Sequence, residues 1–285
     1  MRQSIATILL FSGLVLAIAG CDSADGKIKS PKEYNLEKPE KFTMPETLLE
    51  ISGISFNKGI NDTIYAIQDE EGKLFRLALG NKKQYHGKFG KSGDYEDLSI
   101  VRDKVIILKS NGSLFSFPFT DAIYDEIDSV REYSKILPEG EYEGMYGDEI
   151  SGKLYILCKN CKVDNNDNVT GYIYRADGDE LTRQGEFNID VDPVKPFSGK
   201  VKKGLRPSAL AKNPLTHEWF IVSAVNQLLV ITDENWKVKA AYPLNGNTFN
   251  QPEGIAFDAA GNMYISNEGD DISAGNILKF ARLKQ

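Results

Sequence analysis

Histidine and cysteine are scarce in this sequence, which has two histidines and three cysteines in 285 residues. A structural zinc site needs four such ligands close together, so the sequence does not favour one. Basic residues are also outnumbered, with 34 lysines and arginines against 41 acidic residues and a net charge of −7. Because phosphate binding needs a basic surface, this balance argues against nucleic acid as a partner.

Several enzyme motifs and long helices are missing as well. The sequence has no Gly-x-Ser-x-Gly nucleophile elbow, and no glycine-rich phosphate loop follows a predicted strand. Helical periodicity is weak throughout; the best candidate, 121–131, is expected to be one turn in a loop. No pairing of a nucleophile with a base can therefore be read from the chain.

The one long apolar run lies at the N-terminus, at 5–18. It is too short for a membrane-spanning helix and fits the core of a signal peptide. It ends in the sequence IAGC at 18–21, which resembles a bacterial lipobox. That resemblance implies that Cys21 becomes the first mature residue and carries lipid. We expect a signal peptide at 1–20, a flexible tether at 21–33 and a cell-envelope protein held at the membrane by Cys21, with the choice of membrane left open.

The other two cysteines, Cys158 and Cys161, form a Cys-x-x-Cys pair after a predicted strand at 154–157. An exported protein can oxidise such a pair. A thioredoxin-like motif would instead open a helix. A local disulfide or two free thiols are favoured, with a redox or metal role as the alternative.

Short strands of alternating polarity follow one another along the mature chain, and polar turns separate them. A short signature recurs among them: Glu or Ser, then usually a small residue, then an aliphatic residue that starts a strand. Its first positions are separated by 44, 47, 65 and 45 residues and are Ser52, Glu96, Glu143, Ser208 and Glu253.

A period near 45 with several strands per unit is typical of propeller blades. We predict an all-β domain at 34–285, a five-bladed β-propeller of four-stranded antiparallel blades. The segment at 34–44 would supply the missing outer strand of the last blade and remove an open sheet edge. Six blades are the alternative, if the 65-residue interval hides a degenerate unit.

Propeller geometry would place the five signature positions around one opening of the central channel. Three carboxylates so close must share protons or surround a cation. Ca²⁺ fits best, because it accepts six to eight hard oxygens in irregular geometry. The predicted calcium ligands of this ring are Glu96, Glu143 and Glu253, with Ser52 and Ser208 as further ligand contacts.

A second layer is predicted from the ends of the second strands. Aligning 65–69 with 264–268 makes Asp69 and Glu268 equivalent, and the two neighbour each other where the ring closes. Both are candidate metal ligands, although acidic residues at such places often satisfy turn backbone groups instead. Lys159 occupies the same position in the third blade. Arg206, directly before the fourth signature, is a candidate contact for an anionic ligand, with a solvated loop as the alternative.

The five signatures resemble the SdiA-regulated domain family, which is distantly related to NHL-repeat propellers. The stretches that carry the resemblance are 50–54, 65–74, 251–258 and 261–268. The resemblance implies a five-bladed propeller with calcium at Glu96, Glu143 and Glu253. Lys159 departs from the acidic residue expected in the third blade. Some members of that family are described as phytase-like or esterase-like.

Two functions of different class follow from these observations. The first is a binding protein, expected to be a monomer, whose channel calcium is structural and whose channel face holds a small molecule or a protein. The alternative is a calcium-dependent hydrolase of phosphoesters, esters or lactones, with a channel carboxylate as general base. Binding is favoured because no nucleophile with its base can be recognised.

Overall fold

The computed structural model describes residues 30–81, 83–178, 180–197 and 204–283. The predicted signal peptide, Cys21 and most of the predicted tether lie outside these residues. The described chain is almost entirely strand and loop, with four short 3-10 helices. No helix within this part of the chain has the length and apolar character that crossing a membrane requires.

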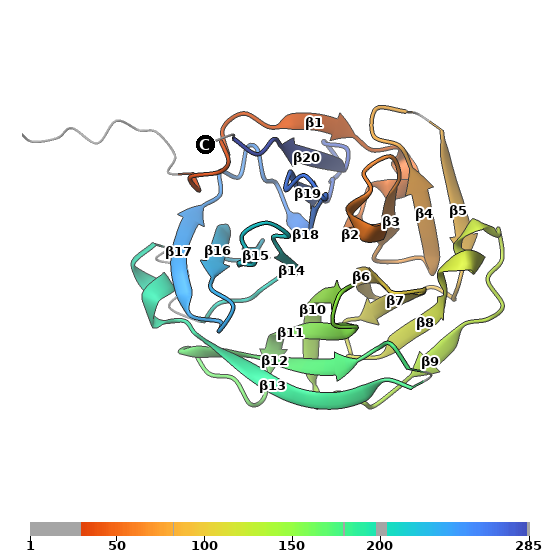
Figure 1. The fold of residues 1–285 in the computed structure, drawn as a ribbon. Coiled ribbons are helices and arrows are strands. Elements are labelled where there is room, and N and C mark those ends of the chain that lie inside the picture. Colours follow the sequence, from red (N-terminus) through yellow and green to blue (C-terminus); the bar gives the residue numbers. More distant parts are fainter. Residues whose placement is uncertain (1–29, 82, 179, 198–203, 284–285) are drawn as a thin grey trace, which may run out of the picture.

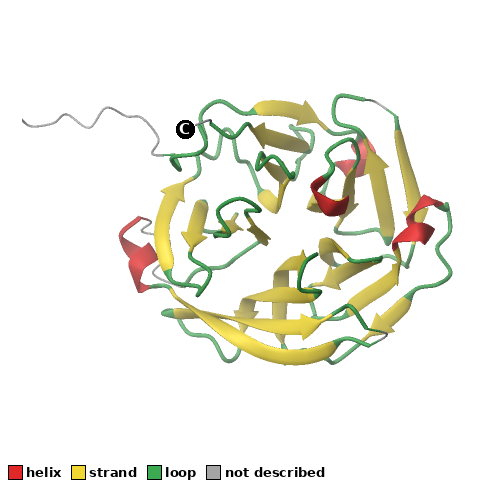
Figure 2. Cartoon of the chain, in the orientation of Figure 1, coloured by secondary structure: helices red, strands yellow, loops and turns green. Residues whose placement is uncertain are grey.

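Five sheets of four antiparallel strands form a ring, and their innermost strands face the centre (Figures 1 and 2). The first blade consists of β2 (Ile51–Phe56), β3 (Ile64–Gln68), β4 (Lys73–Leu77) and β5 (Gln84–Lys88). The second consists of β6 (Tyr95–Val101), β7 (Lys104–Lys109), β8 (Leu114–Pro118) and β9 (Arg131–Tyr133). The third consists of β10 (Gly140–Asp148), β11 (Lys153–Cys161), β12 (Asn168–Arg175) and β13 (Thr182–Asp190). The fourth consists of β14 (Ala209–Lys212), β15 (Trp219–Ser223), β16 (Leu228–Thr232) and β17 (Val238–Pro243). The fifth consists of β18 (Pro252–Phe257), β19 (Met263–Asn267), β20 (Asn276–Phe280) and β1 (Glu40–Thr43).

This arrangement confirms the predicted five-bladed propeller. The long interval between the third and fourth signatures holds no extra sheet in its described residues, so the six-bladed alternative is wrong. Its length is taken up by the long strands of the third blade and by η4 (Asp192–Phe197). The other 3-10 helices are η1 (Glu46–Leu48), η2 (Asn57–Gly59) and η3 (Phe119–Ile123), the last overlapping the start of the stretch 121–131 where one turn was expected.

The N-terminal segment closes the ring. β1 pairs antiparallel with β20, with Phe42 opposite Ile277, so the last blade takes its outer strand from the start of the domain as predicted. Ahead of β1, the buried Tyr34 donates a hydrogen bond to the Gly261 carbonyl (2.7 Å) and accepts one from Asn213 Nδ2 (2.9 Å). This segment therefore ties the fourth blade to the fifth and leaves no open edge between them.

Neighbouring inner strands touch at the small residue of the signature. A Cβ atom at Gly53 would lie 2.5 Å from Asp97 Oδ1 of the second blade, and one at Gly254 would lie 2.5 Å from the Ser52 carbonyl oxygen of the first. Gly144 meets β14 in the same way. The repeat keeps this position small because the blades converge there toward the channel axis.

Candidate functional site

Each signature glutamate lies at an irregularity in the pairing of its inner strand. In the second blade, Tyr95 pairs with Lys109 and Asp97 pairs with Leu108, which leaves Glu96 unpaired between them. Glu143 and Glu253 occupy the same place in β10 and β18. Such a β-bulge turns the extra side chain out of the regular alternation of the strand. The bulge explains how a glutamate in a buried inner strand can point to the channel mouth.

Electrostatic coupling shows that these carboxylates share one mouth. The pKa of Glu96 is raised to about 7, mainly by burial and also by the charges of Asp94 and Glu253, while Lys159 and a hydrogen bond from Ser110 oppose the rise. Burial also raises the pKa of Glu253, and a hydrogen bond from Ser208 and the charge of Lys159 counteract it. The side chains come from four different blades, so the mouth is a shared feature of the ring.

Glu143 carries the third carboxylate of this mouth and forms an ion pair with Lys159 through Oε1. Its other oxygen, Oε2, is buried and has no hydrogen-bond partner in the described part of the chain. Lys159 lies at the end of β11 between Cys158 and Cys161, which form a disulfide with their Cα atoms 6.0 Å apart. Lys159, which stands where an acidic residue was expected, therefore supplies a positive charge among the carboxylates of this mouth.

The second layer joins the first. Burial raises the pKa of Asp69 to about 6, with Glu50 and Glu70 contributing. The pKa of Glu268 is raised to about 8, mainly by burial and also by the nearby charges of Glu253, Asp69, Glu50 and Glu96. Asp69 Oδ1 is a second buried oxygen without a hydrogen-bond partner among the residues described. We use the term acidic mouth for Glu96, Glu143, Glu253, Asp69 and Glu268.

The predicted ligand contacts other than Lys159 are held within the blades. Ser52 and Ser208 are buried. Ser208 Oγ accepts a hydrogen bond from the Ala224 backbone N–H (3.3 Å), and the Ser52 carbonyl accepts one from Ser266 Oγ (2.6 Å). The backbone of Arg206 donates to Asn226 Oδ1 (2.8 Å). Of these residues, Ser208 reaches the acidic mouth through its hydrogen bond to Glu253.

The acidic mouth is wider than a closed metal shell. Among the described residues, the group of three His, Cys, Asp and Glu side chains whose donor atoms all lie within 4.8 Å of one another is Cys158, Cys161 and Asp164. Its two sulfurs are bonded to each other, so they are not free to ligate zinc. The donors of the acidic mouth are hard oxygens, the ligand type that Ca²⁺ prefers, but no three of them converge to that distance.

Three acidic residues that matter near this site were not predicted from the sequence. Asp94 and Glu50 raise the pKa values of the mouth carboxylates. The buried Asp97 accepts hydrogen bonds from the Leu98 backbone N–H (2.8 Å) and from that of Met145 in the next blade (2.7 Å). Asp97 stands at the position where the other signatures carry a small residue. This difference between the repeats is the sequence feature from which Asp97 could have been predicted.

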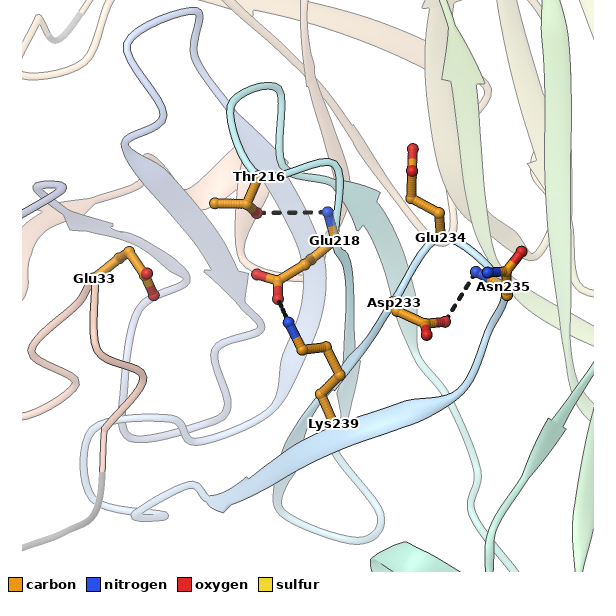
Figure 3. A pocket seen from close by; sticks show the side chains of 7 residues that line it. All are labelled: Glu33, Thr216, Glu218, Asp233, Glu234, Asn235 and Lys239. Carbon is orange, nitrogen blue, oxygen red and sulfur yellow. Dashed lines mark hydrogen bonds and ion pairs between the residues drawn. The ribbon is translucent and has the colours of Figure 1, made fainter.

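A separate pocket of about 460 Å³ lies at the turns of the fourth blade that join β14 to β15 and β16 to β17 (Figure 3). Four of its lining residues are acidic: Glu33, Glu218, Asp233 and Glu234. Glu218 is paired with Lys239, and Glu234 with Lys212 at 3.2 Å. Because these ion pairs already balance part of its charge, the pocket offers no buried, uncompensated donor of the kind found at the acidic mouth.

Comparison with known proteins supports the fold. No family model matches the chain, and no curated protein matches it in sequence. The glutaminyl cyclase of Myxococcus xanthus is similar in structure, with a TM-score of 0.57, 12% identity, and coverage of 86% of this chain and 96% of that one. A luciferin-regenerating enzyme is similar with a TM-score of 0.52, 9% identity, and coverage of 86% and 95%.

A third similar structure is regucalcin, a calcium-binding protein of Agrobacterium tumefaciens, at a TM-score of 0.49, 14% identity, and coverage of 88% and 94%. This likeness is too distant to support an argument about metal binding. What the first two likenesses and the strand topology establish together is that the chain is a five-bladed β-propeller.

Proposed function

We propose that the acidic mouth binds Ca²⁺ and that the protein is a binding protein rather than an enzyme. The observation that carries the proposal is a set of partly buried carboxylates, several of which have raised pKa values, among them Glu96 at about 7 and Glu268 at about 8. Carboxylates in such a position either hold protons or need a cation.

The donor set suits Ca²⁺ in chemistry. Glu143 Oε2 and Asp69 Oδ1 are buried acceptors without a hydrogen-bond donor in the described residues, and a cation bound beside either one would satisfy it. Ca²⁺ accepts irregular shells completed by water, which fits carboxylates spread more widely than a zinc site. Glu96, Glu253 and Glu268 would complete the set. The resemblance to the SdiA-regulated family favours the same ion.

Lys159 gives the mouth one positive side chain among the carboxylates. Ca²⁺ and Lys159 together would leave a mouth that can attract an anionic group of a small molecule or a partner protein. The resemblance of IAGC to a lipobox supports a location of this binding face at the cell envelope, on a protein anchored through Cys21. Changing Cys21→Ser should then release the protein from the membrane fraction, and unchanged membrane association would contradict the anchor.

Calcium-dependent hydrolysis is the second candidate. Glu96 favours it, because a carboxyl group with a pKa of about 7 matches the needs of a general base or acid near neutral pH. Ca²⁺ would polarise an ester or phosphoester oxygen. Turnover of phosphoester, ester or lactone substrates that requires Ca²⁺ and is lost in Glu96→Gln would favour the hydrolase over the binding protein.

Calorimetry tests the calcium site. The purified protein should bind Ca²⁺, and a variant carrying Glu96→Gln, Glu143→Gln and Glu253→Gln should not. A matched control carries Glu218→Gln, Asp233→Asn and Glu234→Gln, which remove the same number of carboxylates from the pocket of Figure 3. Equal calcium binding in the triple variant and the wild type, or no binding in either, would reject the proposal.

A further inference from the structure

A second opening of the channel lies opposite the acidic mouth. A cavity of about 420 Å³ is formed there by the far ends of β2, β6, β10, β14 and β18 together with the turns that follow them. The signature glutamates start these strands, whereas the cavity lies toward their ends. The channel therefore has two chemically different mouths.

The walls of this cavity are set by the same repeat that builds the acidic mouth. The aliphatic position of every signature lines the cavity, one residue from each blade: Ile54, Leu98, Met145, Leu210 and Ile255. All five side chains are buried. A pocket of a few hundred Å³ with mostly apolar walls is the usual form of a small-molecule site, and polar groups in it set the orientation of the ligand.

One polar group in the wall lacks a partner. Tyr146 lines the cavity and packs edge-on against Trp219, with ring centroids 5.4 Å apart. No hydrogen bond to its hydroxyl is made by any residue the structure describes, and burial raises the pKa of that hydroxyl above its usual value. The hydroxyl is therefore a neutral hydrogen-bond donor on the cavity wall, available to an acceptor that enters the cavity.

The rim carries charges of both signs that compensate one another. Lys58 of the first blade and Glu149 of the third, which are not neighbours in the ring, approach to 3.8 Å. The Arg102 backbone N–H of the second blade donates to Glu149 Oε2 (2.5 Å). Ile150, beside Glu149, is 87% exposed and adds an apolar surface to the rim. The acidic residues of the lining outnumber the basic ones by one, Asp148, Glu149 and Asp258 against Lys58 and Lys212, so the cavity does not favour an anionic ligand.

We propose that this cavity binds an uncharged, mostly apolar small molecule that carries a carbonyl oxygen, with the oxygen accepting a hydrogen bond from Tyr146. The site is independent of the acidic mouth and of calcium, because none of the mouth carboxylates lines it. The channel would then hold an ion at one end and an apolar ligand at the other.

A pair of matched aromatic probes tests the hydrogen bond. Prodan is an uncharged dimethylaminonaphthalene with a propionyl group and environment-sensitive fluorescence; its 6-propyl analogue lacks only the carbonyl oxygen and serves as its competitor. Tyr146→Phe should weaken prodan binding about fivefold, the equivalent of one net hydrogen bond, and leave binding of the propyl analogue unchanged. Because the hydroxyl has no partner, the fold should tolerate this change. Equal weakening of both probes, or of neither, would overturn the assignment of Tyr146.

Location is tested by filling the cavity. Ser55 lines it from β2, and Ser55→Phe should abolish prodan binding while the melting temperature and calcium binding stay near the wild type. If that variant fails to fold, the comparison of the two probes on Tyr146→Phe decides alone. Ile123→Ser changes an exposed apolar residue of η3 that does not line the cavity, and it should leave the affinity within twofold. Prodan binding that survives Ser55→Phe or is lost in Ile123→Ser, or its absence in the wild type, would overturn the proposal.

Discussion

Lys159 shows how one residue can set the charge of the acidic mouth. It is paired with Glu143, and its charge also lowers the pKa values of Glu96 and Glu253 against the effect of burial. Burial and the other carboxylates outweigh it, since the pKa of Glu96 still reaches about 7. At the scale of single residues, the mouth is therefore a set of carboxylates only partly neutralised by one lysine.

Removing this lysine should change the protonation of its neighbours. In Lys159→Met, we expect the pKa of Glu96 to rise above its wild-type value of about 7, because the opposing positive charge is gone. Titration of the carboxyl carbons by NMR measures the change. Lys162→Met is the matched control: Lys162 lies nearby in sequence but pairs with the exposed Glu139. A Glu96 pKa that stays the same in Lys159→Met, or shifts equally in the control, would contradict this description of the mouth.

At the scale of the strand, the signature combines a bulge with a small residue. The bulge turns the glutamate toward the mouth, and the next residue lets adjacent inner strands approach. Gly53 has little room, because Asp97 of the second blade lies against it. Asp97 in turn accepts backbone hydrogen bonds within its own blade and from the third.

Adding a methyl group at this contact should destabilise the ring. Gly53→Ala would push Asp97 away from its two donors, and we expect a loss of about 2 kcal/mol in the free energy of unfolding, typical of overpacking a tight site. Urea denaturation measures it. Gly185→Ala is the matched control, since no atom lies within 4 Å of a Cβ placed at Gly185 in β13. Similar stabilities for the two variants would show that the inner strands do not pack as described.

The repeat spacing was enough to predict the blade number and the ring closure, because each signature recurs once per blade and the last blade lacked a strand. The bulge at Glu96 could not be predicted, since it appears only as a break in strand pairing. The pair of Glu143 with Lys159 joins two strands of one blade in a way that no spacing encodes. The apolar cavity was missed because Tyr146 and the signature aliphatics look like ordinary core residues in sequence.

At the scale of the whole molecule, the raised pKa values make stability depend on pH. The folded protein holds protons on Asp69, Glu96 and Glu268 up to about pH 6, 7 and 8, whereas the unfolded chain releases them near pH 4. Between these values the native state binds more protons than the unfolded state. Its stability is therefore greatest below the unfolded pKa values and falls as the pH rises through the folded ones.

Chelated protein should show this trend directly. With EDTA present, we expect the free energy of unfolding, obtained from urea melts at constant ionic strength, to decrease between about pH 5 and pH 8. Saturating Ca²⁺ should reverse the trend, because the ion binds the ionised carboxylates of the native state. A chelated protein that becomes more stable over this pH range would contradict the proposed protonation of the mouth.

The most direct test of the central claim is to count the protons released when Ca²⁺ binds. Calorimetric titrations at pH 6.5 in buffers of different ionisation enthalpy give this number. If protons occupy these carboxylates until the cation displaces them, Ca²⁺ binding to the wild type releases protons. The variant with Glu96→Gln, Glu143→Gln and Glu253→Gln should then show neither calcium binding nor proton release. Calcium binding without proton release, or release that persists in the variant, would contradict the claim that these carboxylates form the site.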